Sequence, residues 1–308
     1  MEKSYIYGPV PSRRLGLSLG VDIIPFKVCS LDCVYCQLGP TTQKTVEPKD
    51  YFSEQEIISQ IKKRIESSSR IDYITFSGSG EPTLNAKIRD LIRKIKKITD
   101  IPVAVLTNST LLSRKDVRDA LKQADLVVPS LDGATQEVFE NTNRPHSSLK
   151  IEKIIEGLKQ FRKEFNRDLW LEIILVKGMN DSESHIKSLK KAIHEIKPDK
   201  VQLNTVIRPP SEKFAKPLTK KEMEKIRDFI GNNCEIVAHF HKKGLTPEEE
   251  NLKDIILDMI RRRPVTIEDI SESLGTHKNE VLKYIDMLER ENKIKAVSYE
   301  NKDYYEPK

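Results

Sequence analysis

The feature that most limits the fold of this 308-residue chain is a regular alternation of short apolar runs with longer amphipathic stretches. Each apolar run is bounded by Gly, Pro, Asn, Asp or Ser, as buried parallel strands are. Repeated β-α units predict a parallel sheet with right-handed crossovers and a ligand site at the carboxyl ends of the strands. Six such units are too few for a closed eight-stranded barrel, so we expect an α/β fold with a partial (β/α)6 barrel. The expected strands are residues 19–24, 73–77, 103–107, 126–130, 171–176 and 200–205.

The stretches between these strands have the periodicity of amphipathic helices. The first of them is opened by Ser53, with Glu56 three residues further on, which is the pattern of a capping box. The expected helices are residues 54–67, 86–97, 115–123, 151–165, 183–196 and 220–231.

The pattern changes after His241. Three helices are predicted, over 248–262, 267–274 and 278–292, and residues 293–305 are predicted to form a hairpin. Three helices followed by a small β-hairpin describe a winged helix, a relative of the helix-turn-helix. We therefore expect a catalytic domain over residues 1–244 and a winged-helix-like domain over 245–308.

Charge is distributed unevenly between these two parts. The chain has a net charge of +6, but residues 245–308 contain 11 Lys and Arg against 15 Asp and Glu. A basic first part fits a polyanionic partner such as RNA, and it fits simple solubility equally well. The acidic second part makes binding to duplex DNA unfavourable, because such binding depends on cations that neutralise phosphates. No apolar run is long enough to cross a bilayer and no secretory signal is evident, so we expect a cytoplasmic protein without membrane association.

Three of the four cysteines fall within eight residues, in the pattern Cys29-x3-Cys33-x2-Cys36. Three thiolates on one short loop can bind three corners of an iron–sulfur cubane, which leaves the fourth iron open to a ligand. Two alternatives remain at this point. The thiols could form a zinc site, for which Cys234 would have to supply the fourth ligand, or they could be packing residues without a metal.

The cysteine spacing, with Tyr35 immediately before Cys36, resembles the signature of the radical S-adenosylmethionine (SAM) superfamily. This resemblance implies a [4Fe–4S] cluster held by the three cysteines, and SAM bound to the open iron through its amino and carboxylate groups. It also implies an electron donor of the reduced ferredoxin or flavodoxin type. Reductive cleavage of SAM would then give a 5′-deoxyadenosyl radical that abstracts hydrogen from a substrate.

A second motif lies at the end of the second predicted strand and contains Ser79, Gly80 and Glu81. It resembles the Gly-Gly-Glu segment of the superfamily, which receives the amino group of SAM, although serine here replaces the first glycine. A glycine at this place lets the backbone approach a ligand closely. The alternative is an ordinary β-α turn, since Gly and Pro are common in such turns.

Polar residues also follow the third and fourth predicted strands. Asn108, Ser130 and Asp132 occupy positions that resemble those binding the ribose hydroxyls and carboxylate of SAM in the superfamily, although such residues more often cap helices or form turns. Glu172, on the fifth strand, is a further candidate of this kind, and the alternative is a charge at the edge of the sheet. The arginine pair at 13–14 could bind a substrate phosphate or carboxylate, or could form surface ion pairs.

The stretch from Tyr7 to Gly16, together with the residues around the cysteines, resembles a subgroup described as similar to wyosine (tRNA) synthases. Wyosine synthases have further cysteines upstream that hold a second cluster, whereas this chain has none before Cys29. The resemblance therefore implies subgroup membership rather than that particular reaction.

Three functions follow from these observations. The leading one is a radical SAM oxidoreductase or transferase that acts on RNA or another macromolecule. A second is an activase that installs a glycyl radical on a partner protein. A third, from a different class, is a DNA-binding regulator that senses iron–sulfur or zinc, which the acidic second part and the SAM-type motifs disfavour.

Overall fold

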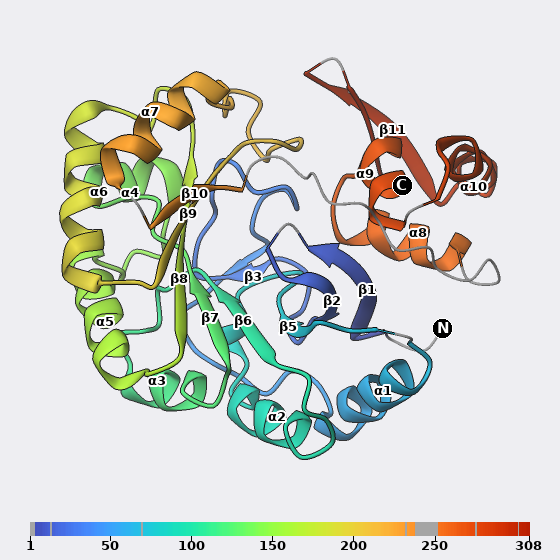
Figure 1. Cartoon of the computed structure of the whole chain (residues 1–308), viewed down its shortest axis with the longest axis horizontal. Coiled ribbons are helices and arrows are strands. Elements are labelled where there is room, and N and C mark those ends of the chain that lie inside the picture. Colours follow the sequence, from blue (N-terminus) through green and yellow to red (C-terminus); the bar gives the residue numbers. More distant parts are fainter. Residues whose placement is uncertain are drawn as a thin grey trace.

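The computed structural model describes residues 4–12, 14–68, 70–231, 233–237, 252–274, 276–300 and 302–308. Its centre is one sheet with the strand order β1-β2-β5-β6-β7-β8-β9-β10 (Figure 1). Neighbouring strands are parallel except for β1 and β2, which are antiparallel. The predicted α/β class and partial barrel are thus confirmed. The strands are β1 (Ile6–Ser12), β2 (Gly16–Val21), β5 (Tyr73–Phe76), β6 (Val103–Thr107), β7 (Leu126–Pro129), β8 (Asp168–Leu175), β9 (Lys200–Thr205) and β10 (Cys234–Ile236).

The strands at the two edges of the sheet differ from the sequence prediction. The strand expected at 19–24 is β2, which begins and ends three residues earlier. Strand β1 was not predicted because it contains Gly8, Pro9 and Pro11, and proline is tolerated only where a strand lies at an edge, as β1 does. Strand β10 is only three residues long, which is too short for a periodic signal.

Helices α1 to α7 lie along the outer side of this curved sheet (Figure 1). Ser53 caps α1 by accepting a hydrogen bond from the amide of Glu56, but the Glu56 side chain accepts from the Tyr5 hydroxyl instead of closing the predicted capping box. Helix α4 was not predicted, and its N-cap is Thr135. The helices are α1 (Glu54–Glu66), α2 (Ile88–Ile95), α3 (Lys115–Leu121), α4 (Gln136–Asn143), α5 (Ile151–Glu164), α6 (Glu183–Ile196) and α7 (Lys220–Ile230).

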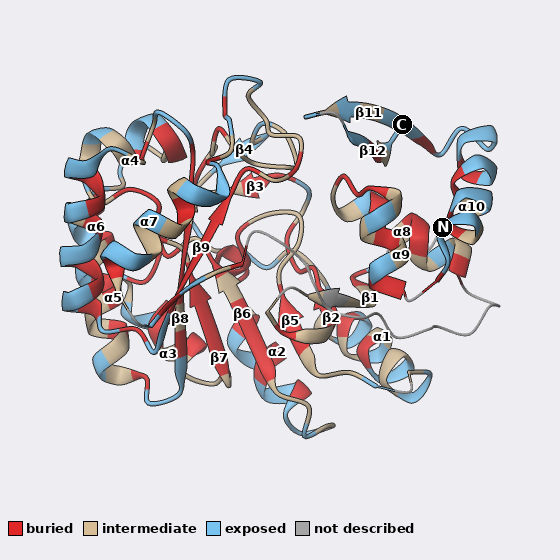
Figure 2. Ribbon diagram, turned by 45° about the horizontal axis from the view of Figure 1, so that its top comes forward, coloured by how far each residue is buried: buried red, intermediate tan, exposed pale blue. Residues whose placement is uncertain are grey.

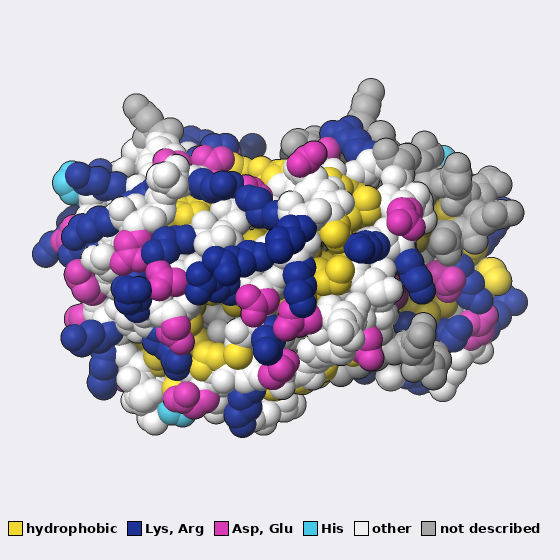
Figure 3. Space-filling model, turned by 90° about the horizontal axis from the view of Figure 1, so that it is seen from below, with side chains coloured by type: hydrophobic (Ala, Val, Ile, Leu, Met, Phe, Trp, Pro, Cys, Tyr) yellow, Lys and Arg dark blue, Asp and Glu magenta, His cyan; other side chains and the backbone are white. Residues whose placement is uncertain are grey.

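Burial follows this layering. The strands are buried, whereas the helices are buried on the side facing the sheet and exposed on the other (Figure 2). The exposed helical surface carries Lys and Arg side chains interspersed with Asp and Glu (Figure 3). Lys94 of α2 pairs with Glu54 at 2.5 Å, and Lys96 pairs with Asp125 at the same distance. Some of the lysines on this surface are therefore balanced by neighbouring carboxylates.

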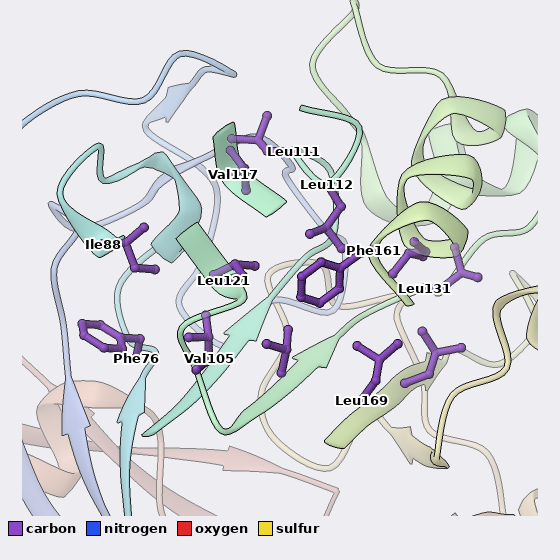
Figure 4. Packing of buried hydrophobic residues seen from close by; sticks show 14 of the residues in the cluster. Phe76, Ile88, Val105, Leu111, Leu112, Val117, Leu121, Leu131, Phe161 and Leu169 are labelled. Carbon is purple, nitrogen blue, oxygen red and sulfur yellow. The ribbon is translucent and has the colours of Figure 1, made fainter. Parts of the chain in front are cut away.

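The main hydrophobic core fills the space between the sheet and the helices. Phe76, Val105 and Leu169 project from strands toward Leu121 of α3 and Phe161 of α5 (Figure 4). All five side chains are buried. Burying a large apolar side chain contributes about 1.5–3 kcal/mol, so this layer fixes the strands and, with them, the positions of the loops at their carboxyl ends.

The described residues of the C-terminal part form three helices and a two-stranded sheet, and helices α8 and α9 contact β1 (Figure 1). This part has its own core, which includes Ile256, Val281 and Leu288, and Val10 of β1 packs against that core. These elements lie where helices and a hairpin were predicted. The name winged helix and the boundary at 244/245 stay predictions, because residues 238–251 lie outside the described residues. The elements are α8 (Leu252–Arg262), α9 (Ile267–Leu274), α10 (Lys278–Arg290), β11 (Ile294–Tyr299) and β12 (Lys302–Pro307).

No helix among the described residues is long and apolar enough to cross a membrane.

Candidate functional site

The cysteine loop lies at the carboxyl end of β2 and is fixed by backbone hydrogen bonds to the end of α4. The amide of Asp32 donates to the carbonyl of Asn143 at 3.0 Å, and the amide of Val34 donates to the carbonyl of Thr142 at 3.1 Å. A turn brings the amide of Cys36 to the carbonyl of Cys33 at 3.1 Å. These backbone hydrogen bonds hold the cysteine loop against the end of α4.

Each of the three thiols has a nitrogen donor nearby. Lys27 Nζ lies 3.1 Å from Cys36 Sγ, and Asn108 Nδ2 lies 3.5 Å from Cys29 Sγ. Asn143 Nδ2 lies 3.4 Å from Cys33 Sγ. Hydrogen bonds to sulfur stabilise thiolates and tune the clusters that they hold. The arrangement therefore favours three thiolate ligands.

The same thiols lie in a setting that opposes ionisation as long as no cation is bound. Burial raises the pKa of Cys29 to about 12, and the Glu81 carboxylate adds to the shift. Burial and the Asp132 carboxylate raise the pKa of Cys33. All the cysteines are free. When a cationic centre binds such adjacent buried thiols, its positive charge stabilises their thiolate form.

The donor set fits a cluster better than a single ion. Among the described residues, no three His, Cys, Asp or Glu side chains are grouped so as to hold one metal ion. In a cubane each cysteine binds a different iron, so the three sulfurs need not converge on one point.

The loop of Ser79, Gly80 and Glu81 packs directly on the cysteine loop. The amide of Lys27 donates to the carbonyl of Ser79 at 2.7 Å, and the amide of Glu81 donates to the carbonyl of Val28 at 3.2 Å. A Cβ atom on Gly80 would lie 2.0 Å from that Val28 carbonyl oxygen. Only glycine therefore permits this close approach of the two loops.

The Glu81 carboxylate is buried and ties this loop to the end of β6. Its Oε1 atom accepts hydrogen bonds from the Thr83 amide at 3.0 Å and from the Thr83 and Thr107 hydroxyls at 2.6 Å. Its Oε2 atom accepts from the Asn108 amide at 2.7 Å. Burial raises the pKa of Glu81, while these hydrogen bonds oppose the shift. One acceptor position on Oε2 remains for a ligand, since a carboxylate oxygen accepts at two sites.

Ser79, the residue that departs from the superfamily pattern, connects the loop to the C-terminal part. Its hydroxyl donates to Asp22 Oδ2 at 2.5 Å, and its amide donates to Asp22 Oδ1 at 3.1 Å. The Asp22 carboxylate also forms an ion pair with Arg262 at the end of α8. The serine thus joins the candidate SAM-binding loop to a helix nearly two hundred residues away in the sequence.

Asp132 is placed differently from the other candidates. Its Oδ1 atom accepts from the Ile174 amide at 2.7 Å, and its Oδ2 atom accepts from Asn143 Nδ2 at 2.8 Å and from the Tyr35 hydroxyl. Burial raises the pKa of Asp132 to about 6, and these hydrogen bonds partly oppose the shift. Through these hydrogen bonds the Asp132 carboxylate supports the cysteine loop, because Tyr35 belongs to that loop and Asn143 contacts Cys33.

The loops at the strand ends surround a cavity of about 420 Å³, which is within the range of small-molecule sites. Eight of the ten predicted site residues line it, whereas Cys33 and Asp132 do not. Arg14, which the sequence offered as an anion ligand or an ion-pair partner, is paired with Glu172 at 2.5 Å, and Arg13 lies outside the described residues. We call the predicted lining residues the strand-end wall: Cys29, Tyr35, Cys36, Ser79, Gly80, Glu81, Asn108 and Ser130.

Sequence reasoning missed the residues that close the cavity from the C-terminal part. Met259, Arg262 and Arg263 of α8 and its C-terminal end line the same space. It also missed Lys27, two residues before the first cysteine. Lys27 could have been predicted from the sequence, because a lysine close to a group of thiolates stabilises their negative charge. The residues of α8 could not, because no motif in their part of the sequence points to the cavity.

Fold and site together define an α/β partial barrel with a cysteine-lined cavity at its strand ends. Residues 23–189 match the model of the Radical SAM superfamily, and the chain belongs to that family. It is 39% identical over 293 residues to a protein named GTPase Obg from Brachyspira hyodysenteriae, a match that covers 94% of this chain but only 43% of that protein. The chain thus spans less than half of this relative.

A second relative matches over nearly its whole length. The UPF0026 protein MJ1312 from Methanocaldococcus jannaschii is 36% identical over 306 residues, which cover 97% of this chain and 94% of the relative. Among solved structures, a radical SAM methyltransferase from Sphaerobacter thermophilus has a TM-score of 0.54 at 17% identity, covering 71% of this chain and 65% of that one. At this identity the likeness concerns the fold alone.

Proposed function

We propose that the chain is a SAM-cleaving enzyme that holds one [4Fe–4S] cluster on Cys29, Cys33 and Cys36. The observation that carries this proposal is the packing of the cysteine loop against Ser79, Gly80 and Glu81, with both loops opening into one cavity at the strand ends. When bound, the cluster and SAM supply the reductive cleavage that gives a 5′-deoxyadenosyl radical and so a hydrogen abstraction.

The residues of the chain bind and orient these groups. The three thiolates hold the cluster, and the donors Lys27, Asn108 and Asn143 stabilise their negative charge. The free acceptor position of Glu81 and the exposed backbone of the loop receive the SAM amino group. Ser130 and Asn108 line the cavity where they can contact the rest of SAM. Asp132 acts through Tyr35 and Asn143 and positions the cysteine loop.

The test is anaerobic reconstitution with iron and sulfide, followed by reduction in the presence of SAM and chromatography for 5′-deoxyadenosine. We expect the wild type to show iron–sulfur absorbance and to release 5′-deoxyadenosine, and Cys33→Ala to do neither. Cys234→Ala is the matched control, because Cys234 is a buried thiol on β10 and is outside the site. Uptake of zinc only, or a complete cluster without SAM binding, would contradict the proposal.

Reaction class, substrate and partners belong to the proposal as well. We propose an oxidoreductase or transferase of the subgroup similar to wyosine synthases, reduced by a ferredoxin or flavodoxin and acting on RNA or another macromolecule in the cytoplasm. The net positive charge of residues 1–244 supports a polyanionic substrate. We further propose that residues 245–308 form a winged-helix-like domain that closes the site rather than binding duplex DNA, because Arg262 and Arg263 face the cavity.

A further inference from the structure

The cavity is lined by more positive than negative charge. Five of its lining side chains are basic and two are acidic, and four of the basic ones are arginines. The buried acidic residue Glu81 is held within the loop network described above. The arginines come from the β1–β2 turn, the segment after β9 and the end of α8. We call these four residues the arginine wall: Arg14, Arg208, Arg262 and Arg263.

Two members of the arginine wall have carboxylate partners nearby. Arg14 pairs with Glu172 at 2.5 Å and also donates to Gln202 Oε1 at 3.3 Å. Arg262 pairs with Asp22 and lies over the ring of Tyr7, with its Cζ atom 4.7 Å from the ring centroid. These guanidinium groups are therefore largely occupied by the chain itself.

Arg208 is buried and lies farther from its carboxylate partner. It donates from Nε to the carbonyl of Pro264 at 3.1 Å, and its nearest atom lies 3.9 Å from Asp269 of α9. This pair joins the segment after β9 to the C-terminal part.

Arg263 is the member without a partner. Among the described residues, its side chain makes no hydrogen bond and no ion pair, although it is half-buried and lines the cavity. The neighbouring positive charge of Arg208, together with burial, lowers the pKa of Arg263 to about 9, and the Asp269 carboxylate only partly opposes this shift, so that Arg263 still carries its charge at neutral pH. A half-buried cation beside a second cation is unfavourable unless an anion binds there.

We propose that Arg263, with Arg208 beside it, forms a subsite for an oxyanion of the substrate, a phosphate or a carboxylate. The proposal deepens the proposed function and rests on it, since it places one charged group of the substrate in the cavity that holds SAM. A guanidinium presents a planar fork of donors that matches both kinds of oxyanion. The C-terminal part thereby supplies a substrate-binding residue.

The carboxylate of SAM is a different anion, and the chain offers a different cation for it. Lys27 lies against Cys36 and is among the charges that act on Cys29. The charged groups with the strongest influence on Arg263 include Arg208, Arg14 and Asp269, which belong to the arginine wall and to α9 rather than to the cysteine loop. A carboxylate held at the cluster therefore meets Lys27, which leaves Arg263 for the substrate.

The experiment is calorimetric titration of the reconstituted full chain, saturated with SAM, with inorganic phosphate in one arm and acetate in the other. We expect one of the two anions to bind, and its affinity to fall at least about tenfold in Arg263→Gln. Arg263→Lys is expected to retain part of the affinity for the anion, because lysine keeps the positive charge but lacks the planar set of donors of a guanidinium. Arg261→Gln is the matched control, because Arg261 is 49% exposed two residues away and does not line the cavity.

The outcomes separate this proposal from the proposed function. Equal anion affinity in wild type and Arg263→Gln, or no binding of either anion at millimolar concentration, overturns the subsite. Competition between the anion and SAM also overturns it, because the cation would then serve SAM. The cluster absorbance and SAM affinity of Arg263→Gln are expected to match the wild type. Failure of the proposed function shows itself differently, as loss of SAM binding and of 5′-deoxyadenosine in the wild type.

Discussion

The two walls of the cavity hold their polar groups in different ways. On the strand-end wall, side chains and backbone bond to one another: the Glu81 carboxylate alone accepts four hydrogen bonds. On the arginine wall, charges from three distant segments meet and Arg263 has no partner within the described part of the chain. A wall whose polar groups bond to one another is ordered before a ligand arrives, whereas an unpaired charge is balanced only when a ligand binds. The first arrangement fits a cofactor common to a family, and the second fits a substrate particular to one member.

The largest expected effect comes from Asp132, which accepts a hydrogen bond from Tyr35 of the strand-end wall but does not itself line the cavity. Burial raises the pKa of Asp132 to about 6. The folded chain therefore keeps a proton that the unfolded chain has already lost, so the free energy of unfolding falls as the pH rises from about 4 to about 6. The expected fall is on the order of 3 kcal/mol. In Asp132→Asn this titrating group is absent, so we expect the fall to shrink by that amount; the slope that remains comes from groups such as Glu81, whose pKa burial also raises.

Urea unfolding of the chain without added iron, at several pH values across this range, measures the effect. The Asn143 amide can turn over to meet the new side chain, because its Oδ1 atom has no partner among the described residues. Asp119→Asn is the control: its partners Lys115 and Lys122 lower the pKa of Asp119 to about 2, so it does not titrate between pH 4 and pH 6. A wild-type curve with the same slope as that of Asp132→Asn would show that Asp132 is not held as described.

A smaller effect is expected where the two walls are joined. Ser79→Ala removes the hydroxyl that donates to the Asp22 carboxylate and leaves that carboxylate with one donor fewer. A hydrogen bond to a charged group contributes about 2 kcal/mol, and we expect the free energy of urea unfolding to fall by about that amount. Ser147→Ala, which alters an exposed serine, is the control and is expected to change little. If both variants unfold alike, Ser79 does not connect the walls.

The smallest effect is a gain of stability on the arginine wall. Arg263→Gln removes a cation that repels Arg208, so we expect the free energy of unfolding to rise by up to about 1 kcal/mol in the absence of ligand. Thermal unfolding monitored by circular dichroism measures the change. Arg261→Gln is expected to show no gain, because Arg261 lies near Asp258 at 3.9 Å rather than near a second cation. A lower melting temperature for Arg263→Gln would mean that the charge is already balanced.

The sequence could place the residues of the strand-end wall at the strand ends because they lie in short motifs directly after strands. Cys29, Gly80 and Asn108 were each assigned to a strand end, and parallel strands bring their carboxyl ends to one edge of the sheet. Asp132 shows the limit of this reasoning. It follows β7 as Asn108 follows β6, yet its carboxylate turns to Tyr35 and lies outside the cavity lining, which depends on side-chain packing that no motif encodes.

The arginine wall as a whole could not be predicted, although Arg14 was named as a possible anion ligand, and the reason is a different one. Its members are separated by up to about 250 residues in the chain, and their meeting depends on how the C-terminal part packs against β1. Arg261, Arg262 and Arg263 are adjacent in the sequence and chemically identical, yet one is exposed, one pairs with Asp22 and one has no partner in the described residues. Only tertiary structure separates these roles.

The ion pair between Asp22 and Arg262 bears on how chains of this type can evolve. The Asp22 side chain is only 6% exposed and begins the loop that follows β2. Domain exchange or gene fusion that replaced α8 would leave this carboxylate buried and without its cation, at a cost of about 3–5 kcal/mol. Such a recombinant would have to change Asp22 in the same step. The barrel and its C-terminal helices are therefore expected to be inherited together, and a lineage that lost one would have to remodel the other.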